Sequence, residues 1–173
     1  MRTLAESVIT AAAVAAGFTA EAVMDKPERE NAALLPARRV QFEFLPATLR
    51  RSPRRVAKFA SVANPDTHRT VRTRVYQRSM LVRVELVSDD EAWLETANLA
   101  FLSALPGRVA DADGNLVTVR ANKAELSGFG SKTVEVFKRR GCIIHTEFTG
   151  MVCRDREVPL IRDVNLVDNL SAE

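Results

Sequence analysis

The sequence predicts an α+β fold, with a mixed, mainly antiparallel sheet that carries a long projecting β-hairpin and is packed by an N-terminal helix and a central helix. Residues 39–45 alternate apolar and polar side chains, and in residues 70–87 alternate apolar side chains from Met80 to Leu86 share one face, which is the pattern of half-buried strands. Residues 3–16 and 88–105 instead repeat apolar side chains at helical spacing. Two such strands, together with two amphipathic helices, favour a sheet with helices packed on it.

The size and composition indicate one domain, residues 1–173, with a real hydrophobic core. The chain has 173 residues, 46% hydrophobic and 27% charged, which is ordinary globular composition. Cys142 and Cys153 are the only cysteines, and their odd spacing of eleven on one strand would point them to opposite faces, so a disulfide framework is not expected.

The N-terminal segment is expected to be a helix and not a signal peptide. Glu6 interrupts the region where an apolar block should begin, and Thr3 with Glu6 has the spacing of a capping box. Gly17 is placed to end the helix, and residues 19–25 suggest a short further turn. The predicted buried face consists of Leu4, Val8, Ala11, Ala12 and Ala15. No segment approaches the roughly 20 apolar residues of a membrane span, so we expect no membrane contact and a cytoplasmic compartment.

Three strands and a turn follow in the first half of the chain. In residues 39–45, Val40, Phe42 and Phe44 fall on one side, and Arg39, Gln41 and Glu43 on the other. Residues 56–62 and 70–87 flank Asn64-Pro65-Asp66-Thr67, a turn with proline at its second position. In the returning strand, the residues expected to face the core are Met80, Val82, Val84 and Leu86.

The second half begins with the central helix and continues in strands. Ser88 and Glu91 have capping-box spacing, and Pro106-Gly107 ends the helix. Its predicted buried stripe is Leu94, Ala97, Phe101 and Leu105. Later strands are expected at 116–121, which follows the turn dipeptide Asp113-Gly114, at 142–152 and, as an edge strand, at 158–167.

The sequence offers no catalytic, cofactor or metal site, so an enzyme is the least expected class. Residues 127–133 lack the glycine that a phosphate-binding loop places directly before its lysine. The Asp111-to-Asn115 segment lacks the ligand series of a calcium loop. Cys142 and His145 lie three apart on a strand, so they should face opposite sides and cannot act as nucleophile and base.

The basic hairpin, residues 49–78, stands out from this ordinary background. It holds nine arginines and lysines against the single acid Asp66. The residues we single out as candidate partner contacts are Arg50, Arg51, Arg54, Arg55, Lys58, Arg72 and Arg74. Three interpretations stay open: charges that guard an exposed edge, a dock for an acidic protein surface, or a path for nucleic-acid phosphates. Only Phe59 and Tyr76 accompany the cations, so base stacking is weakly supported.

The order of elements resembles that of the tail terminator proteins of long-tailed bacteriophages, a tail-completion and head–tail joining family. The resemblance rests on the pattern of residue types in three segments: Arg39-Val40-Gln41-Phe42-Glu43-Phe44-Leu45, the strand-to-helix passage from Val82 to Glu91, and the late strand from Ile143 to Phe148. It implies a small subunit that forms a hexameric ring on the last ring of the tail tube, stops tube growth and presents the surface to which the head joins. It implies no cofactor.

The expected partners follow from that resemblance. They are further copies of the chain, the tail tube protein, sheath and neck or connector proteins, and DNA in the channel through non-specific contact. The expected location is the tail or neck of a virion, after assembly in the host cytoplasm. Two alternatives remain: another neck component, such as a connector or head-completion protein, and a small basic nucleic-acid-binding module.

Overall fold

The computed structural model describes residues 1–26, 35–127 and 140–160. The chain forms two compact units. The first, called here the core unit, comprises Met1–Arg50 and Gln77–Met151. The second, the arm unit, comprises Arg51–Tyr76 and the chain from Val152 onward, of which residues 152–160 are described. Each unit is described by itself below.

The elements in chain order are α1 (Arg2–Ala15), a 3-10 turn η1 (Ala20–Ala22), β1 (Val23–Asp25), β2 (Arg39–Phe44), β3 (Thr48–Ala60), β4 (His68–Ser88), α2 (Glu91–Ala104), β5 (Arg108–Ala110), β6 (Leu116–Ser127) and β7 (Arg140–Pro159). The strand order is β1-β2-β4-β7-β6-β5, and β3 pairs with β4. β1 runs parallel to β2, whereas the pairs β2/β4, β5/β6 and β6/β7 are antiparallel. The predicted α+β class with a mixed, mainly antiparallel sheet is therefore confirmed.

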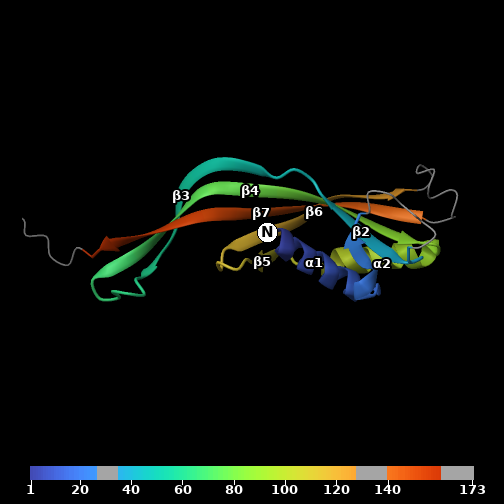
Figure 1. Ribbon diagram of the computed structural model, residues 1–173, viewed down its shortest axis with the longest axis horizontal. Coiled ribbons are helices and arrows are strands. Elements are labelled where there is room, and N and C mark those ends of the chain that lie inside the picture. The colour runs from blue at the N-terminus through green and yellow to red at the C-terminus, as the bar shows by residue number, and fades with distance from the viewer. Residues whose placement is uncertain (27–34, 128–139, 161–173) are drawn as a thin grey trace, which may run out of the picture. The chain divides into compact units, whose positions relative to one another are not determined.

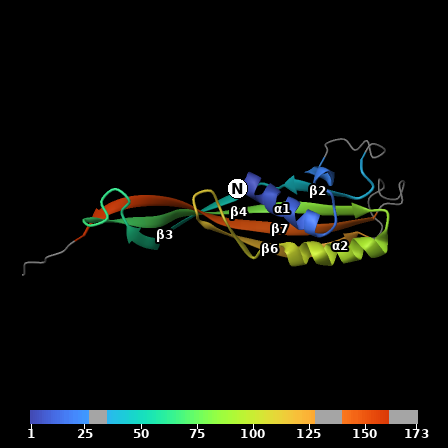
Figure 2. The ribbon, with the colours of Figure 1, turned by 90° about the horizontal axis from the view of Figure 1, so that it is seen from below.

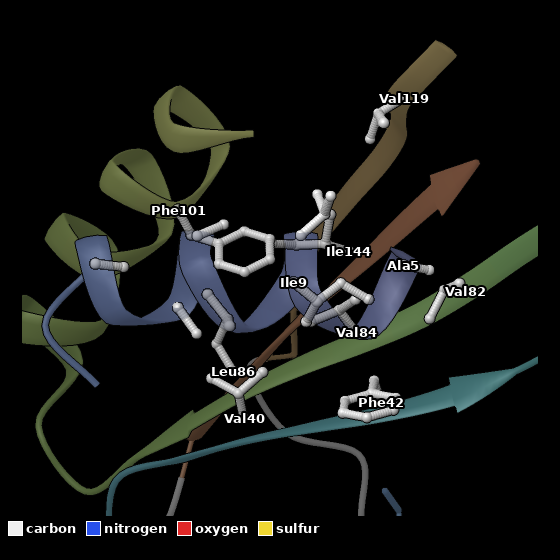
Figure 3. Packing of buried hydrophobic residues seen from close by; sticks show 14 of the residues in the cluster. Ala5, Ile9, Val40, Phe42, Val82, Val84, Leu86, Phe101, Val119 and Ile144 are labelled. Atoms are coloured by element: carbon white, nitrogen blue, oxygen red, sulfur yellow. The ribbon is translucent and has the colours of Figure 1, made fainter. Parts of the chain in front are cut away.

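Both helices cover one face of the core unit's sheet (Figures 1 and 2). The buried cluster lies between that face and the helices. Figure 3 shows Ile9 of α1 and Phe101 of α2 pointing into the same cluster as Val84, Leu86 and Ile144 of the sheet. The predicted core face of β4 is confirmed, because Met80, Val82, Val84 and Leu86 are all buried. On β7, the alternate residues Ile144, Thr146 and Phe148 are buried as well.

The N-terminal helix exists as predicted, but its cap was predicted wrongly and its buried face only in part: Val8 and Ala12 are buried as expected, whereas Ala11 and Ala15 are exposed. Met1 is the N-cap residue and no side chain caps the helix, so Thr3 and Glu6 form no capping box. The buried residues are Ala5, Val8, Ile9, Ala12 and Ala13. Alanines occur on several sides of this helix, so helical spacing alone is compatible with more than one buried face. Gly17 does end the helix: its φ is 93°, and the amide of Phe18 bonds to the Ala13 carbonyl at 3.1 Å.

The central helix also begins at a different cap from the predicted one. Its N-cap is Asp90, whose Oδ1 accepts a hydrogen bond from the Trp93 amide at 3.1 Å. Ser88 instead accepts from the Asp90 amide through its hydroxyl at 3.1 Å, and it forms no capping box with Glu91. The Arg38 guanidinium lies 4.2 Å from the Trp93 ring centroid and 3.7 Å from an Asp90 carboxylate oxygen. The buried positions Leu94, Ala97 and Phe101 are as predicted.

Replacing Asp90 with alanine is expected to lower the free energy of unfolding by about 1 kcal/mol, because the Trp93 amide loses its capping acceptor. Chemical unfolding followed by circular dichroism measures the effect. Asp89→Ala is the matched control, since Asp89 is the neighbouring exposed carboxylate and caps no helix amide. Equal destabilisation by both substitutions would show that the Asp90 cap is not the cause.

The outer face of β2 is more buried than its alternating pattern predicts. Arg39 and Gln41 were expected on a solvent face, yet they are 5% and 1% exposed. β2 is an inner strand between β1 and β4, so neighbouring side chains flank its residues on both faces. Arg39 donates to the Pro36 carbonyl at 3.2 Å. The short parallel strand β1, which makes β2 an inner strand, was predicted only as part of a turn.

The turn between β5 and β6 confirms the predicted turn at Asp113-Gly114 and joins two antiparallel strands. Gly114 has φ 74°, a conformation that favours glycine. Asp111 Oδ1 accepts hydrogen bonds from the Asp113 amide at 3.0 Å and from the Asn115 amide at 2.8 Å. The Asp111 carboxylate thus serves to close the turn. β6 extends to Ser127, beyond the predicted end at residue 121, with a register shift between Ala121 and Lys123.

Candidate interaction arm

The predicted hairpin forms the main part of the arm unit. β3 ends at Ala60, β4 begins at His68, and the Asn64 carbonyl accepts from the Thr67 amide at 3.3 Å and from the His68 amide at 2.9 Å. The turn at Asn64-Pro65-Asp66-Thr67 is therefore confirmed. β3 begins at Thr48, eight residues before the expected start at Val56.

A third strand end completes the arm unit, and the sequence did not indicate it. β7 was predicted to stop at residue 152 but continues to Pro159. Its end is held by a two-bond ion pair, Arg72 Nε to Asp155 Oδ1 and Arg72 Nη2 to Asp155 Oδ2, both at 2.8 Å. The Leu160 amide donates to the Thr67 carbonyl at 2.7 Å, and the Ser61 hydroxyl donates to Glu157. Residues 161–167 of the predicted last strand lie outside the described residues.

Two of the seven singled-out cations work inside the arm unit. Arg72 pairs with Asp155 and its guanidinium lies 5.5 Å from the Phe59 ring centroid. Arg74 donates to the Ser52 carbonyl at 3.1 Å and to the Ser52 hydroxyl at 2.7 Å. Both arginines thus cross-link strands of the arm. Their expected role as partner contacts is less well supported than that of the other five.

The remaining five cations all lie on β3 and are exposed: Arg50, Arg51, Arg54, Arg55 and Lys58. None of these five side chains has a hydrogen bond, ion pair or ring contact to any described residue. Two acids of the described arm are engaged elsewhere, since Asp155 pairs with Arg72 and Glu157 accepts from Ser61. Among the described residues, the five β3 side chains therefore have no paired acid.

The arm unit has no apolar core among its described residues. Only Ser61 and Thr70 are buried in 51–76 and 152–160, and neither is apolar. Five large apolar side chains of this unit are exposed: Val56, Phe59, Val62, Tyr76 and Val152. A sheet normally buries at least one face against another layer. Strand pairing and polar cross-links hold the described arm together, and its apolar side chains are open to a partner.

The Arg72 to Asp155 contact predicts that the arm loosens in acid. The hydrogen bond from Arg72, followed by its charge, lowers the pKa of Asp155. A carboxyl with a lowered folded pKa adds stability that is complete above its unfolded pKa of about 3.9 and is lost as pH falls through the lower folded pKa. The protection factor of the Leu160 amide, which compares its exchange rate with the intrinsic rate at the same pH, should therefore decrease as pH falls through that range. Asp155→Asn should remove the pH dependence, whereas Glu95→Gln, an exposed change in the core unit, should leave it intact.

The core unit carries an open depression on its sheet, of about 440 Å³, lined by Glu43, Leu45, Arg83, Glu125, Ile143 and His145. A hydrogen bond from Lys123, followed by the charge of that lysine, lowers the pKa of Glu125. The depression thus combines two carboxylates with a guanidinium and an imidazole. Beside it on β7, Glu147 accepts from Ser79 of β4 and, at 3.1 Å, from Asn122 of β6. These bonds lower the pKa of Glu147 and tie three strands together.

The structure gives little support to the other residues that the sequence analysis considered for catalysis, phosphate binding or metal binding. Cys142 is buried, which raises its pKa to about 11, whereas His145 lies in the depression, so the two do not form a pair. Cys142 and Cys153 are both free thiols. Of residues 127–133, only Ser127 belongs to the described chain. Within the described ranges, no group of three or more candidate metal ligands occurs, and neither helix has the length and apolarity needed to cross a bilayer.

Comparison with known proteins leaves the family open. No protein-family model matches the chain, and no curated protein matches it. Among solved structures, a chain from the virion of a native gene transfer agent particle aligns with 17% identity and a TM-score of 0.39, covering 83% of this chain and 84% of that one. At this identity and TM-score, the likeness assigns neither a family nor a function.

Proposed function

We propose that the chain is a structural virion protein of the tail terminator type. It forms a ring on the end of the tail tube, ends tail growth and provides the interface for head attachment. The tail terminator class is proposed because residues 39–45, 82–91 and 143–148 resemble the corresponding segments of that family. The observation that carries an assembly role is the arm unit, a described β layer without an apolar core and with exposed apolar side chains and free cations.

The arm favours a protein partner for a physical reason. Val56 and Phe59 of β3 are 39% and 38% exposed beside unpaired arginines. Apolar side chains ringed by charge are the usual composition of a protein-binding surface. A partner that covers them removes apolar area from water, and acids on it compensate the β3 charges. The proposal contains no catalytic step and no cofactor.

Like charges also constrain how copies of the chain can assemble through β3. Two β3 edges related by a twofold axis would bring five cations of one copy against five of the other, and like charges on paired strands are destabilising. Contacts through this edge are therefore heterologous, and a heterologous contact generates a ring where its rotation closes. A hexamer is the stoichiometry that we propose from the resemblance.

Light scattering across a concentration series, alone and with purified tail tube, tests the proposal. We expect a hexamer, either free or capping the tube, with the tube length unchanged on further addition of tube protein. A chain that stays monomeric at every concentration and ignores the tube would overturn the terminator assignment. Pull-down against portal-side proteins would then test the alternative of a connector or head-completion protein.

A nucleic-acid role is the second candidate, favoured by the five uncompensated cations of β3. It requires binding of a duplex oligonucleotide whose affinity falls steeply with salt, with a logarithmic slope of about −0.9 per neutralised phosphate. Of the two aromatic side chains among the cations, Phe59 already lies under the Arg72 guanidinium. Contact would thus be to the phosphate backbone, without base reading.

A further inference from the structure

We propose that the free edge of β3 binds an acidic, extended segment of a partner protein by β-strand addition. This inference rests on the proposed assembly role of the arm and specifies the partner's chemistry. It is carried by three features of the described arm: an unpaired strand edge, uncompensated cations on both sides of that edge, and exposed apolar side chains on the same strand.

The unpaired edge comes from the sheet topology. β3 pairs with β4 and, within the described chain, with no other strand, so one edge of its 13 residues is open. The amide and carbonyl groups on such an edge form a ready template for another strand. Pro53 lies within β3, and proline inside a sheet is confined to edge strands or bulges because it cannot donate to a ladder.

The cations set the kind of strand that the edge accepts. Successive side chains of a strand point to opposite faces, so each of the adjacent pairs Arg50-Arg51 and Arg54-Arg55 places one positive charge on each face of β3. An incoming basic or neutral strand meets these charges without compensation. A strand carrying aspartate or glutamate toward both faces forms cross-strand ion pairs, each contributing about 0.2–1 kcal/mol.

The apolar side chains add contact area next to the charges. Val56 and Phe59 lie on β3 itself, on the C-terminal side of both arginine pairs. An incoming strand with acids opposite Arg54, Arg55 and Lys58 and β-branched residues opposite the apolar positions would cover the apolar side chains while forming ion pairs on both faces. If the charges serve only to guard the edge against aggregation, the edge would bind no strand of any charge, which gives the experiment its clearest contrast.

The test uses the full chain and three fluorescent peptides of about ten residues, a length at the upper end of ordinary strands. The first repeats two glutamates followed by two valines, which places acids on both faces of the strand, and the second has lysine in place of glutamate. The third has the charge of the first but carries prolines at alternate valines. Fluorescence anisotropy should show saturable binding of the first, at least about tenfold weaker binding of the third, and none of the second. Equal binding of the first and third peptides, or no binding of the first, would overturn strand addition.

Two substitutions on β3 locate the binding edge. In an edge strand, backbone amides point alternately toward the paired neighbour and outward, so one of Val56→Pro and Ala57→Pro removes an outward donor and the other removes a bond to β4. Hydrogen exchange across β4 identifies the variant whose arm stays intact. That variant should lose affinity for the glutamate peptide. Wild-type affinity in it would contradict binding at this edge.

A charge variant covers the case in which both prolines disturb the arm. Arg54→Gln with Arg55→Gln should weaken the glutamate peptide at least about tenfold, and Arg108→Gln with Arg120→Gln, at exposed positions of β5 and β6, should not. Salt-sensitive binding of duplex DNA without peptide binding would favour the nucleic-acid role instead. A chain that forms rings yet binds no acidic strand retains the terminator proposal and loses this inference, and strand binding without ring formation gives the reverse.

Discussion

Replacing Phe101 with alanine is expected to lower the free energy of unfolding by about 3–5 kcal/mol, the usual cost of emptying a fully buried aromatic position. Phe101 is 0% exposed and points from α2 into the cluster between both helices and the sheet (Figure 3). Urea unfolding followed by the fluorescence of Trp93, the single tryptophan of the chain, measures the change in the core unit.

Leu99→Ala is the matched control for Phe101. Leu99 lies on the same helix but is 66% exposed, so its truncation should change the unfolding free energy by less than about 0.5 kcal/mol. Similar losses at both positions would show that helix propensity, and not burial of Phe101, sets the stability. A loss below about 1 kcal/mol at Phe101 would contradict the packing described above.

Reversing two β3 charges, Arg54→Glu with Arg55→Glu, is expected to reduce assembly on the tail tube by tenfold or more. Removing one partner of a close charge pair that is desolvated at an interface weakens the binding free energy by about 2–5 kcal/mol. Reversing the charge adds repulsion to this loss. Sedimentation of the chain with purified tube measures the bound fraction. Hydrogen exchange of the arm in the free protein checks that the substitutions leave its strands paired.

Arg108→Glu with Arg120→Glu changes the net charge by the same amount on exposed positions of β5 and β6 in the core unit. Assembly of this control should remain close to that of the wild type. If both double variants lose assembly equally, net charge governs the association and β3 has no special part in it. If neither loses assembly, the partner contact lies elsewhere and the assembly role of β3 fails.

Much of the fold could be predicted from local patterns. The buried faces of β4, β7 and α2 follow from alternation or helical spacing, because the residues that form the apolar face of one element lie close together in sequence. The turn at Asn64-Pro65-Asp66-Thr67 and the end of α1 at Gly17 follow from backbone preferences of single residues. The helix starts were harder, because two or three adjacent polar residues compete as caps and small local shifts choose Asp90 over Ser88.

The candidate interaction arm, likewise, could be predicted from the sequence only in part. The sequence by itself determined the class of the fold, the position of the hairpin and the excess of positive charge in it. Only the tertiary structure decided which cations are engaged: Arg72 meets Asp155, 83 residues away, and Arg74 meets Ser52, whereas the five on β3 meet none in the described chain. The physical reason is that the periodic pattern of a strand depends only on its own residues, and this pattern indicates which of its faces is buried. The partner of a charged side chain depends instead on which strand, distant in sequence, lies beside it. The alternating charges of Arg154 to Glu157 show no apolar period, so the strand that joins the arm becomes visible only through its contacts.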